Sequence, residues 1–97
     1  MPSSIIEEDL IIEGNLSSSE GSVDVKGRVV GDVRAETIKV HVSGSVDGAL
    51  SANKITVEGN HNGSLSCDYL KLASTSQVEA DVVAKEMETD SGAKVKG

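Results

Sequence analysis

The sequence predicts an all-β, single-domain parallel β-helix of about five to six turns, each of roughly 15–17 residues. Three observations lead to this prediction: an internal repeat at near-constant spacing, an alternation of apolar and polar residues within each copy, and a near absence of aromatic residues. The repeat is the most informative of the three, because a repeat of this length decides the architecture of the whole chain.

The clearest copies of the repeat are V-V-G-D-V-R-A-E-T-I-K-V, from Val29 to Val40, and V-D-G-A-L-S-A-N-K-I-T-V, from Val46 to Val57. In both copies an aliphatic residue, a glycine, an aliphatic residue and an alanine alternate with polar residues. Two further aliphatic residues then follow, again separated by one position. A period of two is typical of a β-strand, in which alternate side chains point to opposite faces.

Each copy is too short to hold a strand and a crossover helix. Successive copies carry similar residues at the same slots, so equivalent positions are expected to stack as parallel ladders about 4.8 Å apart. Each copy has six predicted inward slots. Copy by copy, the residues at these slots are Ile12, Gly14, Leu16, Ser18, Val23, Val25; Val29, Gly31, Val33, Ala35, Ile38, Val40; Val46, Gly48, Leu50, Ala52, Ile55, Val57; His61, Gly63, Leu65, Cys67, Leu70, Leu72; and Val78, Ala80, Val82, Ala84, Met87, Thr89. A sixth copy opens with Val95 and Gly97.

The start-to-start spacings of the copies are 17, 17, 15, 17 and 17, as counted between Ile12, Val29, Val46, His61, Val78 and Val95. The variation is assigned to loops. Residues 1–9 precede the first copy and are predicted to be a short polar tail, which places the β-helix domain at residues 10–97. The small residues of the second slot, from Gly14 to Ala80, predict a corner where the backbone bends sharply.

On the outside of the coil, residues of opposite charge are expected side by side in successive turns. Asp24 is expected beside Lys39, and Lys71 beside Glu88. Exposed pairs of this kind are worth about a few tenths of a kcal/mol each, so they are expected to be ordinary solvated surface.

Composition excludes several functional classes. The net charge of −7 argues against a nucleic-acid-binding protein, which needs a basic surface. A single cysteine excludes an internal disulfide framework, and no apolar run reaches the roughly 20 residues that span a bilayer. No signal-peptide pattern precedes the repeat, so a soluble, cytoplasmic chain is expected. With no Trp, no Phe and one Tyr, the core must consist of Val, Ile, Leu and Ala.

The sequence contains no constellation of catalytic or metal-binding residues. His41 is expected at the surface, whereas His61 takes an inward slot, where its ring is either buried and neutral or turned outward. A single histidine without partners in register is no metal site. Cys67 takes an alanine slot and is expected to be a buried, unreactive thiol. The carboxylates are scattered, so no enzyme and no cofactor is predicted.

Several phrases together resemble the bactofilin family over most of the chain, from Ser4 to Gly97. They are E-D-L-I-I-E-G-N-L (Glu8 to Leu16), V-D-V-K-G-R-V-V-G-D-V-R-A (Val23 to Ala35), V-E-G-N-H-N-G-S-L (Val57 to Leu65), V-E-A-D-V-V-A (Val78 to Ala84) and S-G-A-K-V-K-G (Ser91 to Gly97). The resemblance implies a right-handed, triangular β-helix that polymerises end to end into non-polar filaments without a nucleotide.

The same resemblance implies a bacterial cytoskeletal scaffold for cell shape, motility or envelope-associated proteins. Its partners would be further copies of itself and other scaffold or envelope proteins. Its place would be cytoplasmic and cytoskeletal, including the cytoplasmic face of the inner membrane by indirect association. Two features depart from the family: Val95 stands where many members have a Phe at the end-to-end joint, and Glu7, Glu8 and Asp9 would repel anionic lipid.

The ends of such a stack are the predicted polymerisation interface, because an uncapped β-helix exposes unpaired backbone groups and an apolar cross-section. The residues predicted to form it are Leu10, Ile12, Leu16, Val23 and Val25 in the first layer, and Val82, Met87 and Val95 in the last. Head-to-tail contact would produce open fibres, and contact between like ends would give antiparallel junctions. Alternatively, residues 1–9 and 88–97 fold over the two ends.

Two other functions are alternatives to a filament. A hexapeptide-type acyltransferase also stacks short β-turns, but it uses 18-residue turns and usually a catalytic His beside a protruding loop. A solenoid that binds glycan or ice would show regular outward Thr or aromatic ladders, which this chain lacks.

Overall fold

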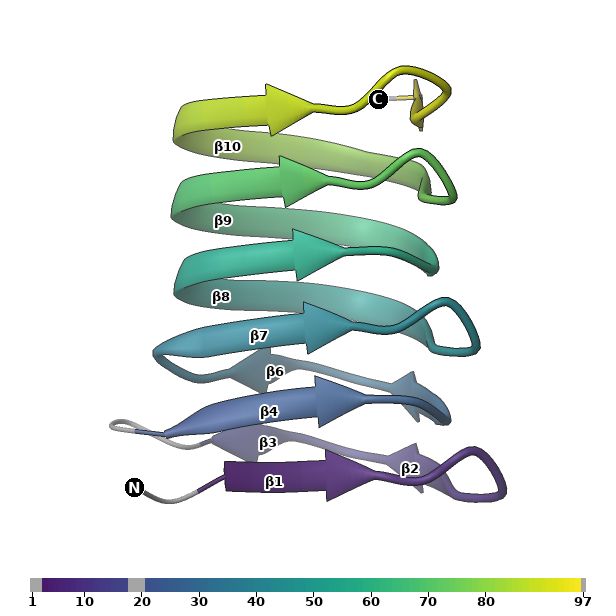
Figure 1. Cartoon of the computed structure of the whole chain (residues 1–97). Coiled ribbons are helices and arrows are strands. Elements are labelled where there is room, and N and C mark those ends of the chain that lie inside the picture. The colour runs from purple at the N-terminus through teal and green to yellow at the C-terminus, as the bar shows by residue number, and fades with distance from the viewer. Residues whose placement is uncertain (1–2, 18–20, 97) are drawn as a thin grey trace.

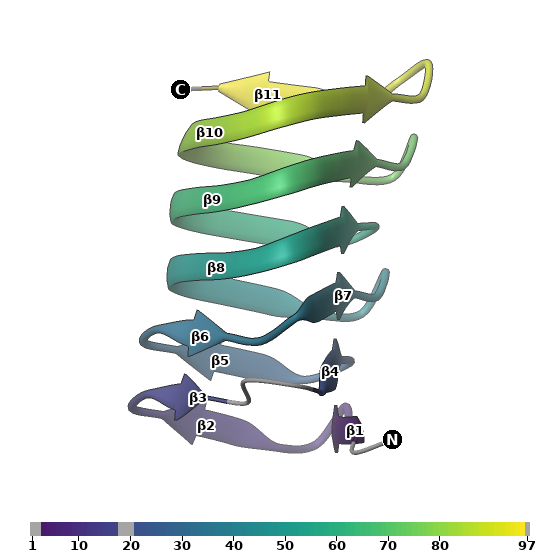
Figure 2. The same cartoon turned by 90° about the vertical axis from the view of Figure 1, so that its left-hand side faces the viewer.

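In the computed structural model, which describes residues 3–17 and 21–96, the chain winds into a coil of stacked β-strands (Figures 1 and 2). In Figure 1 the near strands run from left to right while the chain climbs from the N-terminus to the C-terminus, which is the sense of a right-handed coil. The described strands form one sheet of eleven, and all their pairings are parallel. The predicted right-handed parallel β-helix is confirmed.

Each turn has three straight segments, so the coil has three faces. The strands are β1 (Ser3–Ile6), β2 (Ile11–Glu13), β3 (Leu16–Ser17), β4 (Ser22–Val25), β5 (Arg28–Val30), β6 (Val33–Arg34), β7 (Thr37–Val40), β8 (Ser45–Val57), β9 (Asn60–Leu72), β10 (Gln77–Thr89) and β11 (Lys94–Lys96). Face 1 consists of β1, β4, β7 and residues 54–57, 69–72 and 86–89. Face 2 consists of β2, β5, residues 45–47, 60–62 and 77–79, and β11. Face 3 consists of β3, β6 and residues 50–52, 65–67 and 82–84.

The strand register matches the predicted slots wherever the structure describes them. Val46, for example, pairs with Val29 below it and with His61 above it. The inward aliphatic residues of the middle turns form a continuous core, in which Ile38, Ile55 and Leu70 are fully buried. Two of the predicted slots, at Ser18 and Gly97, lie outside the described residues.

The glycine slot is a bend between faces 2 and 3, as predicted. Gly31, Gly48 and Gly63 have φ angles of +136°, +138° and +123°, in a region that L side chains rarely adopt. At each of them an added Cβ would also overlap the carbonyl oxygen of the glycine one turn below. β8 and β9 pass through this bend and all three faces as strands of 13 residues. β10 is also 13 residues long, but Ala80 at its slot does not have a positive φ.

The shorter spacing between the third and fourth copies has its cause at the corner between faces 1 and 2. Loops of four residues (41–44 and 73–76) and of two residues (26–27 and 58–59) occur at this corner. The Ser43 hydroxyl donates a hydrogen bond to the Lys26 carbonyl at 3.0 Å, and the Thr75 hydroxyl donates to the Glu58 carbonyl at 2.6 Å. Each of these long loops is thereby fixed to the short loop one turn below it.

The segment expected to be a polar tail, residues 1–9, contributes a strand instead. Residues 3–6 form β1, which pairs with β4 and places Ile6 in register with Val25. Ile6 is only 3% exposed, so it is a core residue. Residues 7–10 then form a four-residue turn closed by a hydrogen bond from the Leu10 amide to the Glu7 carbonyl, like the turn from His41 to Gly44. The first turn of the coil therefore includes Ser3 and does not begin near Leu10.

Candidate assembly surfaces at the two ends of the coil

The C-terminal end of the coil has an open strand edge. β11 covers β10 only at residues 77–79, and no described strand pairs with the outer edge of β10 beyond Glu79. Met87 takes an inward slot and is nevertheless 50% exposed, whereas Leu70, directly below it in the same column, is 0% exposed. Val82 and Ala84 are also only partly buried against the core. This end therefore combines free backbone hydrogen-bonding groups with an incompletely covered apolar layer.

The N-terminal end is formed by short strands. Ile12 of β2 and Leu16 of β3 are partly buried inward residues of the first turn. Leu10 lies in the loop before β2 and is exposed, as is its neighbour Ile11. Ile5 is exposed on the outer side of β1. Apolar side chains thus surround this end too, but its described strands provide no long edge.

Val23 and Val25 do not lie at the N-terminal end, where they were predicted. They are 2% and 0% exposed because β1 pairs with β4 and covers them. The physical reason is the additional strand formed by residues 3–6, which was expected to belong to the tail. Val95 lies in β11 with its backbone in register with Val78, and its side chain is outside the described part of the chain.

The structure therefore brings the predicted residues together as two separate groups. Leu10, Ile12 and Leu16 lie in the first turn, and Val82 and Met87 lie on β10 at the other end of the coil (Figure 1).

Ile5 and Ile6 also belong to the first turn, and they were not predicted to lie there. A signal for them was available, since the phrase E-E-D-L that follows them occupies the place of the later four-residue loops.

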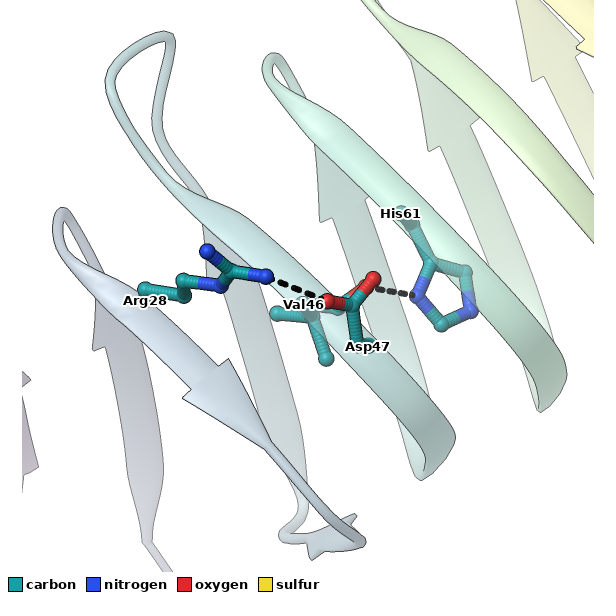
Figure 3. A network of polar contacts seen from close by, with 4 residues as sticks. All are labelled: Arg28, Val46, Asp47 and His61. Carbon is teal, nitrogen blue, oxygen red and sulfur yellow. Dashed lines mark hydrogen bonds and ion pairs between the residues drawn. The ribbon is translucent and has the colours of Figure 1, made fainter. Parts of the chain in front are cut away.

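His61 is the most unusual residue of the core (Figure 3). Its Nδ1 lies 3.3 Å from the Val46 carbonyl oxygen, and its Nε2 lies 2.8 Å from the Ser64 carbonyl oxygen. Burial lowers the pKa of His61, while these two carbonyls and nearby Asp47 oppose that shift. A neutral imidazole has a single N–H donor and so satisfies one of the two carbonyls. Of the two sequence interpretations, the buried ring is the observed one.

The remaining candidates for chemistry have ordinary structural surroundings. Cys67 is buried, and its burial, with a smaller effect of Asp68, raises its pKa to about 11, which opposes formation of a reactive thiolate. Over the described ranges, no group of three or more His, Cys, Asp or Glu side chains is placed to hold a metal ion. In the same part of the chain no helix is long and apolar enough to cross a membrane.

The expected charge pairs lie in register but form other contacts. Asp24 is beside Lys39, and Lys71 beside Glu88. Lys39, however, forms its ion pair with Glu58, at 3.6 Å, and Glu88 accepts a hydrogen bond from the Tyr69 hydroxyl. On face 2 Arg28 pairs with Asp47 at 3.1 Å, close to His61 (Figure 3). Long side chains thus reach partners diagonally across the turns, which the lateral prediction did not allow for.

Comparison with known proteins agrees with this geometry. The family model described as "Bactofilin: Polymer-forming cytoskeletal" matches residues 4–97. A crystal structure of a point mutant of the bactofilin from Thermus thermophilus superposes with a TM-score of 0.85 at 21% sequence identity, over 92% of this chain and 100% of that one. No curated protein sequence matches the chain.

The fold and the ends define a class of protein: a right-handed parallel β-solenoid whose terminal turns keep apolar inward residues without full cover. Within that class the chain belongs to the bactofilin family, a structural family described as polymer-forming and cytoskeletal. The resemblance noted in the sequence, from Ser4 to Gly97, is thereby confirmed.

Proposed function

We propose that this protein is a bacterial cytoskeletal scaffold that polymerises end to end, without a nucleotide and without enzymatic activity, into non-polar filaments. The observation that carries the proposal is the outer edge of β10, where Met87 is half exposed in a column that is otherwise buried in the turns below. Its place in a polymer-forming family supports the same proposal.

The physical argument rests on what an open β-edge needs. Backbone N–H and C=O groups at such an edge are satisfied by water or by another strand, and a second copy offers the strand together with apolar cover for Met87 and Val82. Two β10 edges related by a two-fold axis would run antiparallel, and the first turns of two copies could meet in the same way. Alternating junctions of these two kinds give a filament with no polarity.

The filament would organise other proteins of the cell envelope or the shape-determining machinery. We place it in the cytoplasm, with access to the inner membrane through its partners. Glu7 and Glu8 are exposed on the first loop next to Asp9, and their charge opposes direct contact with anionic lipid.

Negative-stain electron microscopy of the purified chain without nucleotide tests the proposal. Met87→Arg places a charge in the apolar layer of the C-terminal junction. Val83→Arg is the matched control, because Val83 lies on the same strand, is 67% exposed and points away from the core column. We expect unbranched filaments from the parent and from Val83→Arg, and none from Met87→Arg.

Sedimentation of Met87→Arg then determines which ends meet. Contact between like ends leaves the N-terminal junction intact and gives dimers, whereas head-to-tail contact uses the C-terminal end in every junction and leaves monomers. A parent that stays monomeric over a wide range of protein and salt concentration would contradict polymerisation. Filaments of Met87→Arg identical to those of the parent would contradict the assigned interface.

A further inference from the structure

Face 1 presents a strip of lysines on an otherwise acidic protein. Lys39, Lys54 and Lys71 come from three successive turns, on β7, β8 and β9. The outward positions of face 1 in these three turns hold no carboxylate: they are Thr37, Lys39, Lys54, Thr56, Tyr69 and Lys71. This is unexpected in a chain with 9 Lys and Arg against 16 Asp and Glu.

The strip is hollowed into a groove of about 700 Å³. Its walls carry hydrogen-bond donors of two kinds, lysine ammonium groups and hydroxyls. The lining residues are Ser22, Asp24, Thr37, Lys39, Lys54, Thr56, Tyr69 and Lys71. In Figure 1 this face is turned toward the viewer, with β1, β4 and β7 in front. The groove is lateral, so an end-to-end junction leaves it accessible.

The positive charge of the strip is only partly neutralised within the molecule. Lys39 has Glu58 at 3.6 Å, at the corner of the next turn. Lys54 lies over the ring of Tyr69, with its Nζ 5.8 Å from the centroid. Within residues 3–17 and 21–96, neither Lys54 nor Lys71 has a carboxylate within ion-pair distance. Neighbouring unpaired cations in a groove raise the local potential and attract anionic groups.

We propose that the lysine strip, defined as Lys39, Lys54 and Lys71 with the groove between them, binds an extended acidic peptide segment of a partner protein. Stacked turns are about 4.8 Å apart, so Lys39 and Lys71 are separated by about 10 Å along the coil axis. A peptide in the extended polyproline II conformation advances about 3.1 Å per residue with three residues per turn, so carboxylates at positions i and i+3 lie on one side of it and match that separation. Such a segment would lie along the axis, across the strands.

Both ends of the strip limit the length of the acidic segment. Asp24 lies in the turn below Lys39, and Glu88 in the turn above Lys71. Glu86 stands beside Glu88 on the same face, in register with Tyr69. An acidic run of three or four residues fits between these carboxylates, and a longer one would meet like charge at both ends. This boundary favours a short peptide motif over a long polyanion.

Other occupants fit the surface less well. A nucleic acid strand would have to pass Asp24 and Glu88 and would approach a protein of net charge −7. A membrane surface is too flat to enter the groove. A second copy of face 1 would set lysines against lysines. The acidic loop at Glu7 is closed into a turn by its hydrogen bond from Leu10 and is not extended.

Fluorescence anisotropy with a labelled tetraglutamate peptide tests the proposal at about 50 mM salt, where exposed charges are weakly screened. The triple variant K39Q/K54Q/K71Q neutralises the strip. The control R28Q/R34Q/K85Q removes the same charge from faces 2 and 3 and from the corner after face 3. Loss of three exposed ion pairs between the lysines and the peptide should weaken the affinity of the strip variant by about tenfold. The affinity of the control should fall by less than about twofold.

An equal loss in both triple variants would overturn the proposal, because only the net charge would then matter. No binding of tetraglutamate by the parent would also overturn it. Tighter binding of oligothymidylate, or of phosphatidylserine vesicles, through the same three lysines would replace the peptide with a nucleic acid or a membrane. Circular dichroism of each variant checks the fold, and the monomeric or dimeric Met87→Arg protein gives a readout that does not depend on filament formation.

Discussion

The middle turns and the terminal turns of the coil follow the same sequence pattern with different results. β8 and β9 are continuous strands of 13 residues, and each is paired with neighbours on both sides. At the N-terminal end the first turn is divided into β1, β2 and β3, of two to four residues. At the C-terminal end β10 is again 13 residues long, but it is covered only over its first three residues.

This difference shows that an inward side chain of a solenoid is fully buried only where neighbouring turns cover it. Leu70 and Met87 occupy the same slot of successive copies, and only Leu70 has a full turn on each side of it. The stability of stacked repeats is approximately a sum of such nearest-neighbour interfaces. A further copy of the chain at either end would supply the missing interface, which is the physical basis of the proposed assembly.

The largest effect is expected from a methyl group added at the glycine bend. At Gly48, in the middle, the new Cβ of Gly48→Ala would overlap the Gly31 carbonyl, and φ is +138°. At Gly14, in the first turn, φ is +127° and the new Cβ meets no atom within 4 Å. Strained backbone alone costs about 1–3 kcal/mol, so Gly14→Ala should fall in that range and Gly48→Ala should exceed about 3 kcal/mol. Urea unfolding followed by circular dichroism measures both.

These measurements are best made in the Met87→Arg background at a protein concentration low enough to dissociate the N-terminal junction as well, so that assembly does not add to the apparent stability. Equal losses of unfolding free energy at Gly48 and Gly14 would show that the stacked carbonyl is not the cause. The middle and terminal turns would then not differ in their sensitivity to a methyl group at this slot.

A smaller effect separates Leu70 from Met87. Leu70→Ala removes a fully buried side chain and should cost about 2–5 kcal/mol of unfolding free energy. Met87→Ala, at a half-exposed position, should cost under about 1 kcal/mol in the unassembled chain. Thermal unfolding at low protein concentration gives both values. A loss at Met87 as large as that at Leu70 would indicate that the C-terminal layer is already covered.

The inward slots of the middle turns were predictable because two independent constraints act on each residue: the alternation along its strand and the match to the stacked residues of the neighbouring turns. Val46, for instance, must face inward by alternation and must also match Val29 and His61 in neighbouring turns. The glycine bend was predictable for the same reason. A residue that recurs at one slot of successive copies reports a local geometry that all of those copies share.

The first turn was not predictable in this way. More residues separate Ile6 from its register partner Val25 than separate Ile12 from its partner Val29. A search for copies at the constant spacing of the repeat therefore passes over Ile6.

The charge pairs were not predictable either. Arg28 and Lys39 form ion pairs with Asp47 and Glu58, each one turn and two residues further along. Lateral alignment of the repeat cannot reveal such diagonal contacts, because long flexible side chains choose among several neighbours of similar distance. The lysine strip was missed because the prediction paired Lys39 and Lys71 with carboxylates.

The smallest expected effect is a pH dependence that arises in the middle of the coil and not at its ends. Burial lowers the pKa of His61 below its usual 6.5, so the folded state holds the neutral ring more firmly than the unfolded chain does. His61 therefore contributes its full stability above about pH 6.5. Below that pH the unfolded state binds more protons, and stability falls by up to about 1.4 kcal/mol per pH unit until the folded ring titrates.

The variant His61→Val isolates this contribution, because valine occupies the same slot in the turns on both sides, at Val46 and Val78. The titrating neighbours of the site, Asp47 on β8 with its partner Arg28 on β5, and Glu79 on β10, are the same in both proteins. We therefore expect the parent to lose more unfolding free energy than His61→Val between pH 7.5 and pH 5.5, as measured by urea unfolding. Parallel pH profiles would mean that His61 does not titrate differently on folding. A parent that gains stability on acidification would mean that the imidazolium, by donating to the carbonyls of Val46 and Ser64 together, outweighs the cost of its burial.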